Sequence, residues 1–277
     1  MRSPTPPVLT STSNPRIKAA LALRERRERE RSGLTLVDGA RELRRALDTG
    51  VEVVEAFVCE PLLAGPDARA ALDRLRAGTA PVHVTNEAAF ARLAFGERAE
   101  GLLAVIRTPS TALESLVLPP DALIIVIEAV EKPGNIGAVL RSADGAGAAA
   151  VVAASPRTDP FNPNAIRASA GTVFTVPLAA APTTAVLAWL RAAGVRIVAA
   201  RVDAERLYTE IDLTGPLALV LGAEADGLTD AWAGEDIEAV RLPMLGVADS
   251  LNVSVSAAIL AYEARRQRGL PPGPRTR

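Results

Sequence analysis

The sequence predicts an α/β protein in which a mainly parallel sheet, covered by helices, follows a smaller α/β unit. Continuous aliphatic runs such as 123–127 and 217–221 are typical of parallel strands that are buried on both faces. Helical patterns such as 136–146 lie between these runs, and an alternation of strand and helix favours a parallel sheet. Residues 109–120, which contain three prolines, are predicted to be a linker between the two units.

The first predicted domain covers residues 1–108, and residues 1–8 are predicted to be disordered because they are rich in Pro, Ser and Thr. Asn86 is a candidate helix cap, with Glu87 favourably placed in the first turn. The expected strands cover residues 34–37, 53–58, 82–84 and 102–106. The expected helices cover residues 14–31, 39–49, 67–77 and 86–94. The strong alternation makes this a small α/β domain of ordinary size.

The second predicted domain covers residues 121–270, and the prolines after residue 270 are expected to end the structure and leave a basic tail. Its expected strands are 123–127, 149–153, 195–199, 217–221 and 239–242. Its expected helices are 136–146, 184–193 and 253–268.

Composition excludes several kinds of site. Cys59 is the only cysteine and His83 the only histidine, so an intrachain disulfide and a zinc site built from several Cys or His side chains are excluded. We therefore expect no metal. The longest apolar runs are too short to cross a bilayer, and the N-terminus lacks an apolar signal core. We expect a soluble cytoplasmic protein with no membrane partner.

The N-terminal segment is locally basic. Residues 1–50 contain eleven Lys or Arg and six Asp or Glu, a net charge of +5, while the rest of the chain carries −6. This distribution is compatible with a phosphate-binding module, in which Arg16 and Lys18 would contact RNA. The alternation of Arg and Glu is equally compatible with a solvated helix held by salt bridges.

Three polar segments follow predicted strands of the second domain. They are Asn135-x-Gly137-x-x-x-Arg141, then Leu221-Gly222-x-Glu224-x-x-Gly227-Leu228, then Leu242-Pro243-Met244-x-Gly246 running into Ser250-Leu251-Asn252. Ligands of parallel sheets bind beyond the carboxyl ends of the strands, so these segments predict one composite site. The chain has no dinucleotide-binding or Walker-type glycine motif and no Ser-His-Asp arrangement. Taken singly, each residue favours a structural interpretation, in which Asn135 caps a helix and Arg141 is a surface charge.

This ordered set resembles the signature motifs of the SpoU/TrmH family, which are RNA ribose 2′-O-methyltransferases of the SPOUT superfamily. The likeness covers residues 121–268, and the first domain more loosely resembles the ribosomal-protein-like RNA-binding domain often found ahead of it. The resemblance implies a C-terminal trefoil knot, a homodimer with each site near the subunit interface, and S-adenosylmethionine as cofactor. It also implies contacts between the cofactor and Ala200, Gly222, Leu242, Met244 and Leu251.

The resemblance further implies a catalytic set and a second RNA-facing arginine at Arg167. The catalytic set is Asn135, Arg141, Glu224, Ser250 and Asn252. In the family proposal, Arg141 activates the ribose hydroxyl, but a guanidinium remains protonated in proteins. We therefore expect Arg141 to pair with a phosphate and orient the hydroxyl, with a phosphate oxygen, water or transiently neutral Arg141 as proton acceptor.

The expected function is S-adenosylmethionine-dependent 2′-O-methylation of a ribose in RNA, with ribosomal RNA as the favoured substrate. Transfer RNA is the nearest alternative substrate. An RNA-binding homologue without catalysis is a second alternative, although the complete catalytic set argues against it. An enzyme acting on a small molecule is a third, against which the basic N-terminal segment counts.

Overall fold

The computed structural model describes residues 8–95, 100–223 and 226–269, so the N-terminal segment 1–7 and the basic tail predicted from sequence lie outside the described residues. The chain divides into two compact units. The first comprises Met1–Pro109 together with Phe161–Thr175, and the second comprises Ser110–Pro160 together with Val176–Arg277. Within the second unit, Ala180 N–H donates to Thr111 O at 2.8 Å, so part of the segment predicted as a linker packs beside a strand.

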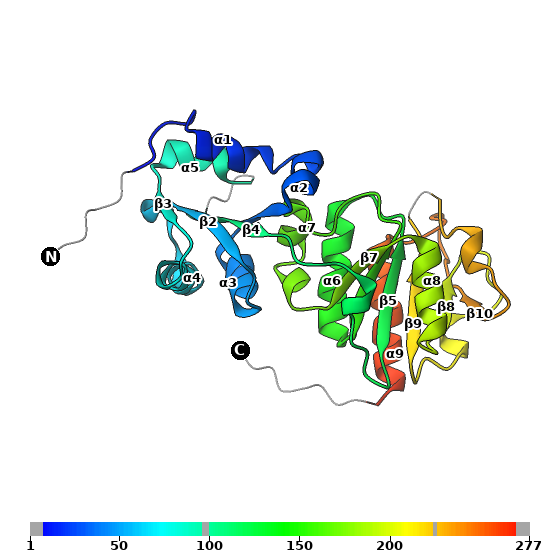
Figure 1. The fold of residues 1–277 in the computed structure, drawn as a ribbon. Coiled ribbons are helices and arrows are strands. Elements are labelled where there is room, and N and C mark those ends of the chain that lie inside the picture. The colour runs from blue at the N-terminus through cyan, green and yellow to red at the C-terminus, as the bar shows by residue number, and fades with distance from the viewer. Residues whose placement is uncertain (1–7, 96–99, 224–225, 270–277) are drawn as a thin grey trace. The chain divides into compact units, whose positions relative to one another are not determined.

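The first unit is built on a mixed sheet with the strand order β1-β4-β2-β3, in which β2 and β3 are parallel and the other pairs antiparallel. Helices α1 and α5 lie on one side of this sheet, and α3 and α4 lie on the other (Figure 1). Its strands are β1 (Leu34–Asp38), β2 (Val53–Val58), β3 (Val82–Val84) and β4 (Leu102–Arg107). Its helices are α1 (Pro15–Ala22), α2 (Arg26–Ser32), α3 (Ala40–Asp48), α4 (Gly65–Ala77), α5 (Glu87–Leu93) and α7 (Pro163–Ala168).

The single helix predicted for residues 14–31 is wrong, because the chain breaks between α1 and α2. Buried Arg29 donates from Nη1 to Leu23 O at 2.9 Å and to Arg24 O at 2.7 Å. In a continuous helix these carbonyls would accept from backbone amides four residues later. The guanidinium therefore satisfies the end of α1 and allows α2 to start in a new direction. The predicted Asn86 cap of α5 is confirmed, since its side chain accepts from Ala89 N–H.

The second unit contains the predicted parallel sheet, whose strand order is β10-β8-β9-β5-β6-β7 and whose neighbouring strands are all parallel. Its strands are β5 (Leu123–Glu128), β6 (Ala150–Ala154), β7 (Leu178–Ala181), β8 (Arg196–Ala200), β9 (Leu217–Leu221) and β10 (Ile237–Val240). Its helices are α6 (Pro133–Ala146), α8 (Thr183–Ala192) and α9 (Val253–Gln267). Strand β7 and, in the first unit, helix α7 were not predicted from sequence, because both are too short to show a clear period.

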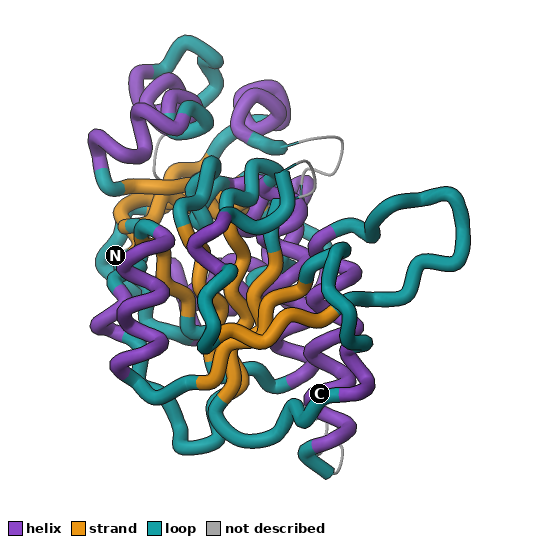
Figure 2. Tube along the Cα trace, turned by 90° about the vertical axis from the view of Figure 1, so that its right-hand side faces the viewer, coloured by secondary structure: helices purple, strands orange, loops and turns teal. Residues whose placement is uncertain are grey.

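Helices cover both faces of this sheet. The buried residues of α8 pack in one core cluster with Ile124 and Val126, while α9 contacts β5, β9 and α6. Figure 1 shows α8 and α9 on opposite sides, and Figure 2 shows helices on both sides of the strands. Because side chains alternate along a strand, burial of both faces explains why Leu123–Glu128 is aliphatic at every position but its last. Among the described residues, no helix is long and apolar enough to cross a membrane.

Asp38, at the end of β1, is a buried carboxylate of the first unit. Its Oδ2 accepts from Phe95 N–H at 2.7 Å and from Arg167 Nη1 at 3.0 Å. Its Oδ1 is buried and has no hydrogen-bond partner among the described residues. Burial outweighs these favourable contacts and raises the pKa of Asp38 to about 6.

This raised pKa predicts a pH dependence of stability that Asp38→Asn removes. The folded state holds the Asp38 proton more tightly than the unfolded chain, so this contribution is complete below pH 3.8 and is lost as the pH rises through about 6. Between pH 7 and pH 5, the wild type should gain about 1 kcal/mol in free energy of unfolding relative to the variant. Urea denaturation of both proteins at the two pH values measures this; an equal response to pH would contradict it.

Candidate active site

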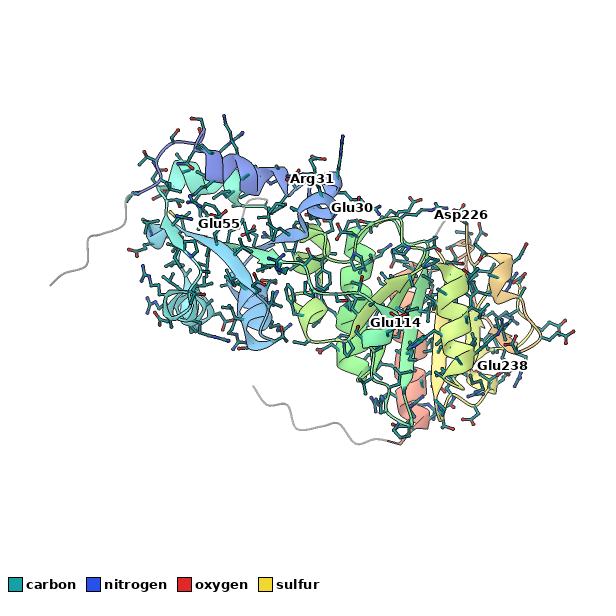
Figure 3. All side chains as sticks on the ribbon, viewed as in Figure 1. Glu30, Arg31, Glu55, Glu114, Asp226 and Glu238 are labelled. Atoms are coloured by element: carbon teal, nitrogen blue, oxygen red, sulfur yellow. The ribbon has the colours of Figure 1, made fainter. Side chains whose placement is uncertain are left out.

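A cavity of about 430 Å³ lies where β8, β9 and β10 end. Three segments line it: residues 200–203 from the last residue of β8 onward, described residues within 221–228 from the last residue of β9 onward, and residues within 242–256 before and at the start of α9. Figure 3 marks this end of the sheet by the label of Asp226, a lining residue. The volume is within the range of about 300–1,000 Å³ that is typical of small-molecule sites.

Gly222 gives the second of these segments its shape. The chain turns back on itself after β9, with an isolated antiparallel bridge between Ala223 and Gly227. Gly227 N–H donates to Ala223 O at 2.9 Å. A Cβ at Gly222 would lie 2.1 Å from the carbonyl carbon and oxygen of Gly227, closer than real Cβ contacts. Only glycine therefore allows the two arms of this turn to approach so closely.

All of the residues predicted to contact the cofactor lie in the lining of this one cavity. They are Ala200, Gly222, Leu242, Met244 and Leu251. Ser250, predicted as catalytic, lies in the same lining. The structure thus brings together residues that the sequence separates, and their binding role remains a prediction.

Acidic side chains predominate among the charged residues of the lining. Asp203, Asp226 and Asp249 are carboxylates, and Arg201 carries the only positive charge among the described lining residues. Arg201 donates from Nε and Nη2 to the two carboxylate oxygens of Asp203, at 3.0 and 3.1 Å. These hydrogen bonds lower the pKa of Asp203 and hold it ionised. Asp226 Oδ2 likewise pairs with Arg157 Nη2 at 3.1 Å. Asp249 is therefore the lining carboxylate that has no ion pair among the described residues and can attract a cationic group of a ligand.

Asn135 and Asn252 meet beside the start of two helices. Asn252 Nδ2 donates to Asn135 Oδ1 at 3.2 Å, which joins the N-terminal turn of α6 to that of α9. Asn252 also caps α9, because its Oδ1 accepts from Ser254 N–H at 2.9 Å. The helix-cap role considered for Asn135 from sequence is wrong, because Lys132 is the N-cap of α6 and Asn135 lies inside its first turn.

Two other predicted catalytic residues are placed differently. Arg141 is exposed on α6, and its guanidinium makes no hydrogen bond or ion pair with any residue that the structure describes. Its guanidinium is therefore available to a ligand. Glu224 lies outside the described residues.

Three of the residues predicted to contact RNA belong to the first unit: Arg16, Lys18 and Arg167. Neither these residues nor Arg141 are among the residues that line the cavity. Arg167 donates from Nη1 to Asp38 Oδ2 and to Phe95 O, at 3.0 and 2.7 Å, and its side chain remains 34% exposed. Arg16 forms an ion pair with Glu55 at 3.2 Å, and Lys18 is exposed.

The charged lining residues were not predicted from sequence. Asp226 occupies one of the unspecified positions of the motif that begins at Leu221. Its place just after a predicted strand could have indicated a position in the site. Arg201 and Asp203 follow β8 in a segment without a recognisable motif, so only the three-dimensional structure reveals them.

Comparison with protein families gives two matches. Residues 122–262 match the SpoU rRNA Methylase family, and residues 14–104 match the MRM3-like substrate binding domain. Together these matches cover most of both units. The chain is also 32% identical over 258 residues to the 23S rRNA (uridine(2479)-2′-O)-methyltransferase of Streptomyces viridochromogenes, covering 89% of this chain and 87% of that protein.

Solved structures with similar folds carry related names. An RNA 2′-O ribose methyltransferase matches with a TM-score of 0.83 and 44% identity, covering 95% of this chain and all of the other. The AdoMet-bound rRNA methyltransferase of Sinorhizobium meliloti matches with a TM-score of 0.86 and 28% identity, covering 96% and 99% of the two chains. Both likenesses extend over the two units.

The close approach at Gly222 predicts a strong effect of Gly222→Ala on binding of S-adenosylmethionine. The added methyl group forces the turn after β9 to open, which displaces cavity-lining backbone, so we expect affinity to fall at least about ten-fold. Calorimetric titration measures this, and thermal unfolding establishes that the variant is folded. Gly134→Ala is the control, because a Cβ there meets no described atom within 4 Å. Unchanged affinity in a folded Gly222→Ala protein would refute the assignment of this turn.

Proposed function

This chain belongs to the SpoU rRNA Methylase family, and we propose on that premise that it transfers a methyl group from S-adenosylmethionine to a ribose 2′-hydroxyl of ribosomal RNA. The observation that carries the proposal is the single cavity that unites all five expected cofactor contacts with Ser250. The relatives named as 23S rRNA 2′-O-methyltransferases support the substrate class.

The cavity suits S-adenosylmethionine in shape and charge. Its apolar lining includes Leu221, Leu228 and Leu251, which can cover the adenosine. Gly222 has no side chain, so a ligand can approach its backbone closely. Asp249, which has no ion pair among the described residues, can provide negative charge for a cationic group of the ligand. When bound, S-adenosylmethionine supplies a methyl group on a positively charged sulfur, which a nucleophilic oxygen can attack.

The chain's own residues would bind and orient the second reactant. The ribose oxygen forms the new bond to carbon as the carbon–sulfur bond breaks, and the hydroxyl proton leaves to an acceptor. We assign Arg141 to the phosphate beside the target ribose, because its guanidinium is exposed, permanently charged and suited to bidentate pairing. Its contribution is to hold the hydroxyl in a reactive orientation rather than to remove the proton.

Asn135, Ser250 and Asn252 are proposed to complete this arrangement. The hydrogen bond from Asn252 to Asn135 links the starts of α6 and α9, so both amides are held near the cavity rim. Ser250 lines the cavity two residues before the α9 cap. We also propose that Glu224, which lies outside the described residues, holds a neighbouring polar group in place.

The first unit is proposed to recognise RNA through the side of its sheet covered by α1 and α5. Residues 14–32 and 86–94, which contain α1, α2 and α5, together carry eight Lys or Arg and four Asp or Glu. Lys18, Arg27 and Arg92 are exposed and have no ion-pair partner among the described residues. Other charges in these segments are neutralised by neighbours on the same helix: on α2, Arg31 forms an ion pair with Glu28. Figure 3 labels Arg31, which points outward from α2. The unpaired cations are available to phosphates.

We also propose a homodimer, a cytoplasmic location and the knotted C-terminal path that the family resemblance implies. Four large apolar side chains of the second unit support a subunit interface, because they are exposed in the single chain: Leu245, Val247, Val255 and Tyr262. They lie on the loop before α9 and on α9 itself, next to lining residues of the cavity, and the family resemblance implies that each site lies near the subunit interface. A cytoplasmic location follows from the proposed ribosomal RNA substrate.

The proposed role of Arg141 predicts that Arg141→Ala abolishes methyl transfer while leaving the affinity for S-adenosylmethionine nearly unchanged. The substitution removes the phosphate-orienting charge but no residue of the cavity lining. Transfer of labelled methyl groups to ribosomal RNA and to transfer RNA measures turnover, and calorimetry measures affinity. The control is Arg191→Ala, an α8 arginine bound to Asp236. Lost cofactor binding with turnover retained would show the role to be wrong.

The proposed RNA-binding side predicts that two substitutions of basic residues in the first unit, one on each side of the sheet, affect RNA affinity differently. Lys18→Ala removes an unpaired cation of α1, so RNA affinity should fall and the slope of log affinity against log salt should decrease by about 0.7–0.9. Arg69→Ala removes an exposed, unpaired cation of α4 on the other side of the sheet and should leave both quantities unchanged. Filter binding of a ribosomal RNA fragment over a range of salt concentrations distinguishes the two. Equal effects would reject this choice of surface.

A further inference from the structure

Glu128 is a buried glutamate that the proposed chemistry does not use. It is the last residue of β5, in the interior of the parallel sheet, and only 1% of its surface is exposed. Burying a carboxylate is costly unless hydrogen bonds replace the lost water. An aliphatic residue at this position would be buried at a lower cost in free energy, so the glutamate indicates a specific role for its hydrogen bonds.

Its two oxygens bind two threonines that are distant in sequence. Oε1 accepts from Thr183 Oγ1 at 2.8 Å and from Thr229 Oγ1 at 2.9 Å, while Oε2 accepts from Thr229 N–H at 2.8 Å. Thr229 thus donates both its backbone and its side chain to one carboxylate. Hydrogen bonds to a charged acceptor are stronger than those between neutral groups, so Thr229 is held firmly.

The position of Thr229 makes this contact relevant to the cavity. The segment after β9 leaves the sheet at Gly222, turns back at Gly227 and reaches Thr229, which directly follows the lining residue Leu228. One end of the turn is anchored by β9, and Glu128 anchors the other. Thr183, in contrast, begins α8 and is absent from the cavity lining.

We infer that Glu128 is a positioning residue for the cofactor: its buried carboxylate binds Thr229 and thereby fixes the position of the lining residues Asp226, Gly227 and Leu228, which directly precede Thr229. The inference rests on the proposed function, because it assigns these lining residues to S-adenosylmethionine. Glu128 itself does not line the cavity, so it acts through Thr229 and not by touching the ligand.

The two threonines allow a matched test. Thr229→Val and Thr183→Val each remove one hydroxyl that donates to the same Oε1 atom, one on the cavity turn and one on α8. Thr229→Val should raise the Kd and the KM for S-adenosylmethionine about ten-fold with a smaller change in kcat. Both variants should lower the midpoint of thermal unfolding by a similar amount, but Thr183→Val should leave Kd and KM at their wild-type values. Glu128→Gln should lie between wild type and Thr229→Val, because its amide still offers one acceptor oxygen to Thr229 N–H.

The outcomes separate this inference from the proposed function. Calorimetry of the wild-type protein with S-adenosylmethionine comes first, and a failure to bind would overturn both. If the wild type binds, the inference is overturned when Thr229→Val leaves Kd unchanged, or when the two threonine variants change Kd equally. A purely structural Glu128 gives that second result, since each variant would then lower stability without a specific effect on the cofactor.

Discussion

The parallel direction of every strand in the second unit's sheet is the constraint on which the site depends. Because β5, β8, β9 and β10 run the same way, their carboxyl ends meet at one edge, and the segments that follow them converge there. Loop segments separated by tens of residues can therefore share one cavity. The aliphatic core that holds this sheet together is thus also what positions the polar residues at its edge.

Glycine and buried polar contacts then refine what the sheet makes possible. Gly222 lets the turn after β9 fold tightly on Gly227, and Glu128 fastens the far end of that turn through Thr229. On the rim, Asn252 both caps α9 and binds Asn135 of α6. A few hydrogen bonds and one close backbone approach therefore shape the cavity, while the apolar core of the sheet supplies the rigid support that small-molecule binding sites need.

Sequence reasoning succeeded where local pattern controls structure. The aliphatic runs predicted the sheet, and the position of Gly222 and Leu242 after strands predicted that they would share a site. It failed where distant residues decide the outcome. Nothing local shows that Arg29 ends α1, or that Glu128 binds Thr229 across 101 residues. Arg167 likewise binds Asp38 across 129 residues, a pairing that no spacing rule could give.

The central claim is that the segments after β8, β9 and β10 form one site for S-adenosylmethionine. A crystal structure of the protein with S-adenosylhomocysteine tests it most directly. The account predicts ligand density in the cavity, within van der Waals contact of Gly222, Leu242 and Leu251, with the sulfur facing the side on which Asn135 and Asn252 meet. Density elsewhere on the chain, with this cavity closed by side chains, would contradict it.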